Sequence, residues 1–240
     1  MKKRAIVLCL AAGILLLGTR YVQRAEELQA TYTMSQTAEL PVVVIDAGHG
    51  GKDPGKVGVN GVLEKDINLS IALRLKSLLE QNEVAVVMTR EEDRDLASED
   101  ASSRKNEDLR ARAGLVRDTS PVVMVSIHQN SFPEEDVDGA QVFYYSGSEE
   151  GKRLGTMVQE QLRQELSDGN HRTAKANKEY YLLKKATCPA VIVECGFLSN
   201  TAEAELLAME EYQEKIAFAI HLGILEYINT MEEDYGNKDN

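Results

Sequence analysis

The feature that most constrains the fold is a regular alternation of short apolar runs with amphipathic segments. Runs at residues 41–46, 84–89, 122–127 and 190–193 are almost entirely apolar and rich in β-branched residues. Continuous runs of this kind are typical of strands buried on both faces of a parallel sheet. Between them, segments at 65–82, 107–116, 151–166 and 211–230 are predicted as helices; in the first, Ile67, Ile71, Leu75 and Leu78 recur at spacings of four, four and three.

This alternation predicts an α/β fold. We expect a single-domain open sandwich in which helices cover both faces of a mostly parallel, twisted sheet. Two further runs, at 140–145 and 180–183, are predicted as additional strands, and the charged, serine-rich stretch at 91–106 as a long loop.

The N-terminus predicts export. Residues 1–4 form a basic head, and residues 5–18 are almost wholly apolar, so we interpret residues 1–20 as a signal peptide or a signal anchor. As a helix the apolar run spans about 21 Å, less than the ~30 Å of membrane hydrocarbon, and no clear cleavage motif follows it. A buried helix of the domain is the alternative, and the adjoining cations argue against it. Residues 21–39 are then a linker, 40–231 the catalytic domain and 232–240 a polar tail.

Composition excludes several classes of partner and site. The chain carries 27 Lys and Arg against 39 Asp and Glu, a net charge of −12, which repels phosphate backbones and argues against nucleic acid as a partner. Membrane contact is expected only through the N-terminal segment. Three cysteines without CxxC spacing make neither a disulfide framework nor a zinc finger. A metal site must therefore use carboxylates and some of the four histidines, at positions 49, 128, 171 and 221.

Four chemically capable side chains fall where such a fold binds ligands. In open α/β sheets this place is the edge formed by the carboxyl ends of the strands. His49 follows the first strand in a glycine-rich turn, His128 ends the third strand, and Glu194 ends the strand at 190–193. Glu64 opens the first helix. Two histidines and a carboxylate, with a position left for water, are the ligands of a catalytic zinc site, and Glu194 would be the general base.

Each residue also has a simpler interpretation. The glycine-rich turn at 48–51 could hold a phosphate, although it matches neither common phosphate-binding motif. His128 could be a hydrogen-bonded core histidine, Glu64 a carboxylate that favours the positive helix end, and Glu194 a satisfied buried acid. Cys195 is interpreted as a packing residue, His221 as a packing or surface residue, and His171 as a solvated loop residue.

Four segments resemble the signatures of one known family. VVVIDAGHGGKDPG, GVLEKDINL, VSIHQNS and PAVIVECGFLSN, in this order over residues 41–228, are similar to the zinc-dependent N-acetylmuramoyl-L-alanine amidases (Amidase_3). The resemblance implies one zinc ion per chain, with His49, Glu64 and His128 as ligands and Glu194 as the catalytic residue. It also implies peptidoglycan as the substrate. Asp46 could orient a ligand imidazole, or hold the end of its strand.

Other segments narrow the resemblance. TREEDRDL, SRKNEDLRARAGLV and GAQVFYY resemble the germination-specific branch of the family, which implies a role in spore cortex maturation and muramic-δ-lactam formation, on the cortex side of the forespore membrane. Ala47, Lys56 and Gln129 depart from the family pattern, and Gln129 lies beside a ligand. Three alternatives stay open: a non-catalytic peptidoglycan-binding protein, an enzyme that needs an exported accessory or activator protein, and a metal-dependent deacetylase or peptidase acting on another wall bond.

Overall fold

A computed structural model describes residues 19–20, 23–24, 40–166 and 169–236 of the chain. All the elements below lie in the compact unit Pro41–Asn240. The predicted signal segment and linker fall almost wholly outside the described residues, as does the end of the polar tail. Among the helices that are described, none combines the length and the apolar character needed to cross a membrane.

The sheet has six strands and is mostly parallel, as predicted. Its order is β2-β1-β3-β6-β4-β5, and every neighbouring pair is parallel except β4 and β6, which are antiparallel. The strands are β1 (Val42–Ala47), β2 (Ala85–Met88), β3 (Val123–Asn130), β4 (Gln141–Tyr145), β5 (Lys175–Asn177) and β6 (Ala190–Phe197). The runs that predicted β1, β3 and β6 form the middle of the sheet, where both faces are covered.

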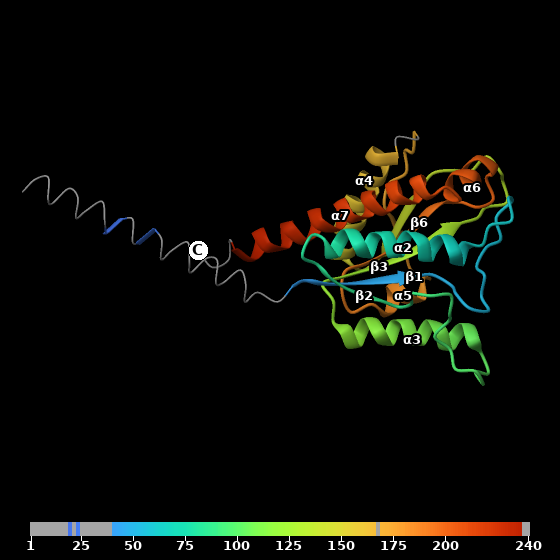
Figure 1. Cartoon of the computed structure of the whole chain (residues 1–240), viewed down its shortest axis with the longest axis horizontal. Coiled ribbons are helices and arrows are strands. Elements are labelled where there is room, and N and C mark those ends of the chain that lie inside the picture. Colours follow the sequence, from blue (N-terminus) through green and yellow to red (C-terminus); the bar gives the residue numbers. More distant parts are fainter. Residues whose placement is uncertain (1–18, 21–22, 25–39, 167–168, 237–240) are drawn as a thin grey trace, which may run out of the picture. The chain divides into compact units, whose positions relative to one another are not determined.

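Helices cover both faces (Figure 1). One face packs against α2 (Glu64–Glu80), α4 (Glu149–Leu166), α6 (Thr201–Leu207) and α7 (Glu210–Gly236), and the other against α3 (Arg104–Thr119) and α5 (Tyr181–Lys185). The apolar repeat of α2 explains its packing, because Ile67, Ile71 and Leu75 all point into the larger core. The open α/β sandwich is confirmed. Helix α7 continues past the predicted end at residue 230.

The predicted strand at 180–183 is wrong, because this segment forms the short helix α5. Its aromatic and leucine residues favour a strand. A strand would, however, send Leu182 and Leu183 to opposite faces, whereas both are buried in the same small core against the sheet. One helical turn buries the two leucines together. The nearby strand β5, with its exposed Lys175 and Ala176, has no apolar pattern and was not predicted.

Helices α4 and α7 are in close backbone contact at Gly223. A Cβ atom there would lie 2.6 Å from the Cα atom and 2.9 Å from the backbone nitrogen of Val158. Since backbone atoms cannot rotate away, Gly223→Ala is expected to lower the free energy of unfolding by about 1–3 kcal/mol, measured by urea denaturation. Gly114→Ala in α3 is the control, because only the flexible end of Arg117 lies near its added Cβ. Equal stability of both variants would contradict this account of the contact.

Candidate metal centre

The first part of the site is the turn that follows β1. His49 has a φ of 60°, in the left-handed region, and the next two residues, Gly50 and Gly51, also have positive φ. Gly48 is required for a different reason: a Cβ atom there would lie 2.3 Å from the His128 ring. The turn therefore brings the His49 imidazole to within 5.0 Å of the His128 ring, centroid to centroid.

The Glu64 carboxylate contacts both histidines. It begins α2 and is only 3% exposed. Its Oε1 atom lies 3.2 Å from Nε2 of His49 and 3.0 Å from Nδ1 of His128. One ligand atom from each of the three residues lies within 4.8 Å of the others. Three residues predicted from separate segments are thus brought together at the carboxyl edge of the sheet.

The electrostatics of this group follow from its burial and its pairing. Burial raises the pKa of Glu64, but hydrogen bonds and attraction from the two imidazoles outweigh this and hold the pKa well below its usual range. Burial lowers the pKa of His49, but Glu64 and Asp53 outweigh it and raise the pKa to about 9. Both imidazoles therefore lie against the negative charge of Glu64. The same charge would stabilise a cation bound between them.

Asp53 contacts the ring nitrogen of His49 that faces away from Glu64, and it was not predicted from the sequence. Its Oδ2 atom lies 2.8 Å from Nδ1 of His49, and its Oδ1 atom accepts from the backbone N–H of Gly55 at 3.0 Å. If Nδ1 donates to Asp53, Nε2 is the nitrogen that a cation beside Glu64 would bind, and it would do so after losing its proton. A carboxylate in this position orients a histidine as a metal ligand. The only signal in the sequence was its place four residues after His49.

The donor set fits a divalent metal ion. Two imidazole nitrogens and a carboxylate oxygen at these separations are a ligand set that zinc accepts with one position to spare. Backbone N–H groups hold the carboxylate in place, from Lys56 to Oε2 at 2.8 Å and from Gln129 to Oε1 at 3.1 Å. Lys56 and Gln129, interpreted from the sequence as departures from the family pattern, therefore contact the site through their main chain. The Gln129 side chain donates to Asn68, which in turn contacts Glu64.

Glu194 lies beside the metal group on β6. Its Cα is paired with that of His128 across the β3–β6 ladder, so both side chains project from the same face of the sheet. It is 7% exposed, and burial is the main cause that raises its pKa. Its Oε1 atom accepts from the Tyr180 hydroxyl at 3.2 Å, while Oε2 has no hydrogen-bond partner among the described residues. A carboxylate with one free oxygen in this place can accept a proton.

Asp46 is buried at the end of β1 among side chains that donate hydrogen bonds to it. Its side chain accepts hydrogen bonds from Ser126 at 2.6 Å, Thr89 at 2.9 Å and Arg112 at 2.7 Å. Among the described residues, none of its hydrogen bonds reaches an imidazole. The geometry therefore matches the second interpretation of Asp46, a carboxylate that holds the end of its strand.

Two buried arginines hold the turn that carries His49. Arg112 donates to the carbonyl oxygens of Ala47 at 2.8 Å and His49 at 2.7 Å. Arg90 donates to those of Ala47 at 2.9 Å and Gly48 at 3.0 Å. Both side chains are at most 2% exposed. Since water cannot reach these carbonyl groups, the guanidinium groups satisfy them and fix the left-handed turn.

The remaining candidates lie outside the metal group. The N–H groups of Gly48, Gly50 and Gly51 donate to protein oxygens, so the turn does not offer them to a phosphate. His221 is 5% exposed within α7, and Cys195 is fully buried, both consistent with packing roles. A small cavity opens at the metal group, lined by both histidines and by side chains of α3 and α5 that include Lys105, Leu109 and Leu182.

Comparison with known proteins identifies the family. The family model of N-acetylmuramoyl-L-alanine amidases, Amidase_3, matches residues 43–226. The germination-specific N-acetylmuramoyl-L-alanine amidase of Bacillus subtilis is 41% identical over 189 residues, 78% of this chain and 79% of that protein. The CwlD amidase of Clostridioides difficile, solved in complex with the GerS lipoprotein, has a TM-score of 0.77 at 40% identity, over 79% of this chain and 99% of that one. The catalytic domain of CwlV from Bacillus (Paenibacillus) polymyxa has a TM-score of 0.68 at 31% identity, over 79% and 99%. The chain therefore belongs to the Amidase_3 family of N-acetylmuramoyl-L-alanine amidases.

Proposed function

We propose that this amidase is zinc-dependent, with His49, Glu64 and His128 as the zinc ligands and Glu194 as the catalytic residue. The bond cleaved is the amide between the lactyl group of N-acetylmuramic acid and the L-alanine of the stem peptide in peptidoglycan. The observation that carries the proposal is the convergence of two imidazoles and a carboxylate within 4.8 Å, beside a buried carboxylate with a free oxygen.

Different residues of the chain have different roles in the proposed hydrolysis. Bound zinc would supply a Lewis acid for the lactyl carbonyl and lower the pKa of water. Glu194 takes a proton from the attacking water on Oε2 and then delivers it to the leaving nitrogen of L-alanine. A raised pKa suits both steps, because the group must hold the proton between them. Asp53, hydrogen-bonded to Nδ1 of His49, would orient the ring so that Nε2 could bind the ion.

The role of Asp53 gives a direct prediction. Asp53→Ala is expected to weaken zinc affinity about 10- to 100-fold, because the His49 ring loses the partner that sets its tautomer and orientation. Affinity is measured by competition with a chromogenic chelator. The control is Asp118→Ala, which removes an exposed carboxylate in the last turn of α3. An unchanged affinity in Asp53→Ala would remove Asp53 from the site.

The identity of the product tests the reaction. Purified peptidoglycan is digested with the zinc-loaded protein, and the fragments are identified by mass spectrometry. We expect free stem peptides that begin with L-alanine, together with glycan that bears unsubstituted lactyl carboxyl groups. Loss of acetyl groups would instead show a deacetylase, and cleavage within the stem would show a peptidase. Binding without any cleavage, both by the protein alone and after co-expression with exported lipoproteins, would show a non-catalytic wall protein.

We further propose that the protein acts outside the cytoplasm, on the spore cortex. Membership of a cell-wall amidase family requires access to the wall, and the basic head and apolar run at 1–18 supply an export signal. Similarity to the germination-specific amidase of Bacillus subtilis supports action in cortex maturation, where the freed muramic carboxyl would serve muramic-δ-lactam formation. Deletion of the gene is expected to leave cortex without this lactam, measured by muropeptide analysis of purified spores.

An accessory protein is a separate part of the proposal. The similar amidase of Clostridioides difficile was solved in complex with a lipoprotein, and this supports an exported partner for the present chain. The purified protein is assayed alone and after co-expression with candidate exported lipoproteins. Activity that appears only with one of them would establish the dependence, and full activity of the protein alone would exclude it.

A further inference from the structure

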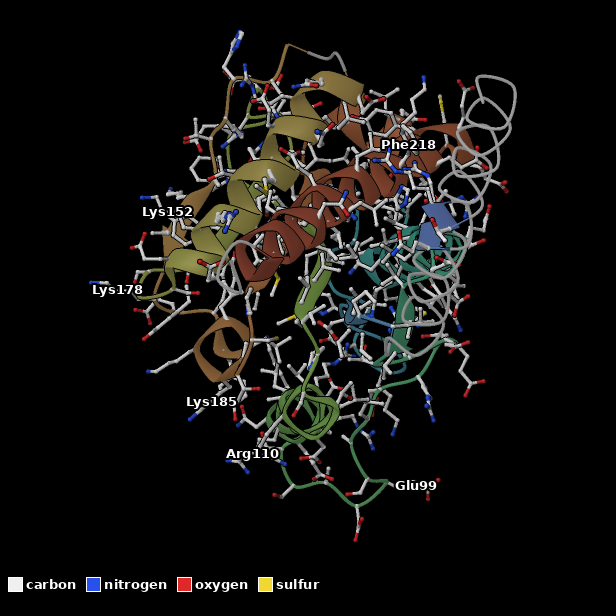
Figure 2. All side chains as sticks on the ribbon, turned by 90° about the vertical axis from the view of Figure 1, so that its left-hand side faces the viewer. Glu99, Arg110, Lys152, Lys178, Lys185 and Phe218 are labelled. Atoms are coloured by element: carbon white, nitrogen blue, oxygen red, sulfur yellow. The ribbon has the colours of Figure 1, made fainter. Side chains whose placement is uncertain are left out.

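Tyr180 is held rigidly at the edge of the site. The side chain of Asn177 accepts hydrogen bonds from the backbone N–H groups of Glu179 at 2.7 Å and Tyr180 at 2.9 Å, which fixes the turn before α5. The Tyr180 ring then packs edge-on against Phe143 of β4, with 5.4 Å between centroids and 74° between planes. The neighbouring Lys178 lies at the outer edge of the molecule (Figure 2), so the segment presents its aromatic side chain inward and its charge outward.

The hydroxyl of this ring makes the two oxygens of Glu194 unequal. It donates to Oε1 at 3.2 Å, whereas Oε2 is buried and has no partner among the described residues. Burial and the adjacent Glu194 raise the pKa of the Tyr180 hydroxyl above its usual value. The hydroxyl therefore keeps its proton and remains a donor. One carboxylate oxygen is tied to the protein, and the other has no hydrogen bond to the described residues.

We propose that Tyr180 is the positioning residue of the general base, and that its hydroxyl holds Glu194 so that Oε2 faces the reacting atoms. The torsion that turns a glutamate carboxylate is broad, so a carboxylate without this bond would sample many orientations. The proton moves from the attacking water to Oε2 and from Oε2 to the leaving nitrogen, while Tyr180 keeps its own proton throughout. This inference rests on the proposed function, since it assigns the partner of the same catalytic residue.

The chain offers a matched pair of variants for the test. Tyr180→Phe removes only the hydroxyl and keeps the ring against Phe143. Tyr181→Phe removes the same group from the next residue, whose side chain is half-buried and belongs to the same small core. With peptidoglycan fragments as substrate, Tyr180→Phe is expected to lower kcat about 10- to 100-fold. This factor corresponds to the free energy of a hydrogen bond to a charged group. KM and zinc content stay at the wild-type level, and Tyr181→Phe behaves as wild type.

A second measurement separates positioning from a general structural effect. In high-resolution crystal structures of the zinc-loaded proteins, the Glu194 carboxylate is expected in one orientation in the wild type and in a rotated or divided one in Tyr180→Phe. An unchanged kcat, a rise in KM alone, an equal loss in both variants, or a single unchanged carboxylate orientation would each overturn the proposal. Failure of the proposed function looks different, because the wild-type protein itself would then release no stem peptide, even when assayed with the accessory protein.

Discussion

Replacing Glu194 with glutamine is expected to lower kcat/KM for stem-peptide release by about 10²- to 10⁴-fold, the usual contribution of a general acid–base group. The amide has nearly the same size as the carboxylate but cannot accept the proton from water. Zinc content should not change, since Glu194 lies outside the group of three residues that would hold the ion. Release is followed by mass spectrometry of digested peptidoglycan, and zinc by elemental analysis of the same preparations.

The control for this variant is Glu205→Gln. Glu205 is an exposed carboxylate in α6, and its loss should leave both activity and zinc at the wild-type level. Undiminished release by Glu194→Gln would exclude Glu194 as the base. A simultaneous loss of zinc would assign Glu194 to the ion instead, and the proposed division of roles would then be wrong.

The local sequence was sufficient to predict the middle of the sheet. The runs that became β1, β3 and β6 are apolar throughout, and such runs are stable only where both faces are covered. The same apolar runs predicted which edge of the sheet lies near His128 and Glu194. The two residues were predicted at the ends of their strands, but both lie within them. Their direct pairing across β3 and β6 depends on register, which the sequence of neither strand specifies alone.

The features that could not be predicted depend on contacts between distant segments. The antiparallel direction of β4 is set by its packing beside β6, and the helical turn of α5 by two leucines that share one core. Tyr180 lies between β5 and α5 in the sequence. Its contact with Glu194 therefore depends on how these two elements pack near β6. Arg112 lies in the segment at 107–116 that was predicted as a helix, but its role in the site was not predicted: its guanidinium group is buried against the carbonyl oxygen of His49. No feature of the neighbouring sequence indicates that a charged residue is buried to hold the turn that carries His49.

His49→Ala and His128→Ala are each expected to lower the zinc content from about one ion per chain to near zero. Each change removes one of three ligands, and it also leaves the buried Glu64 carboxylate without one of the two imidazoles that stabilise its charge. Zinc is measured by elemental analysis after dialysis. His171→Ala is the matched control, because His171 is exposed and lies outside the metal group.

Thermal unfolding gives an independent measure of the same loss. Zinc that binds only the folded chain stabilises it by RT ln(1 + [Zn]/Kd), about 4 kcal/mol when free zinc exceeds Kd 1,000-fold. The Tm of the wild type and of His171→Ala should therefore rise when zinc is added, while the Tm of the two ligand variants should not move. If His49→Ala or His128→Ala kept a full equivalent of zinc and the same rise in Tm, that histidine would not be a ligand. The proposed ligand set would then be wrong, and if the histidine were His128, the position of Glu194 beside the ion would lose its support as well, because it rests on the pairing of these two residues.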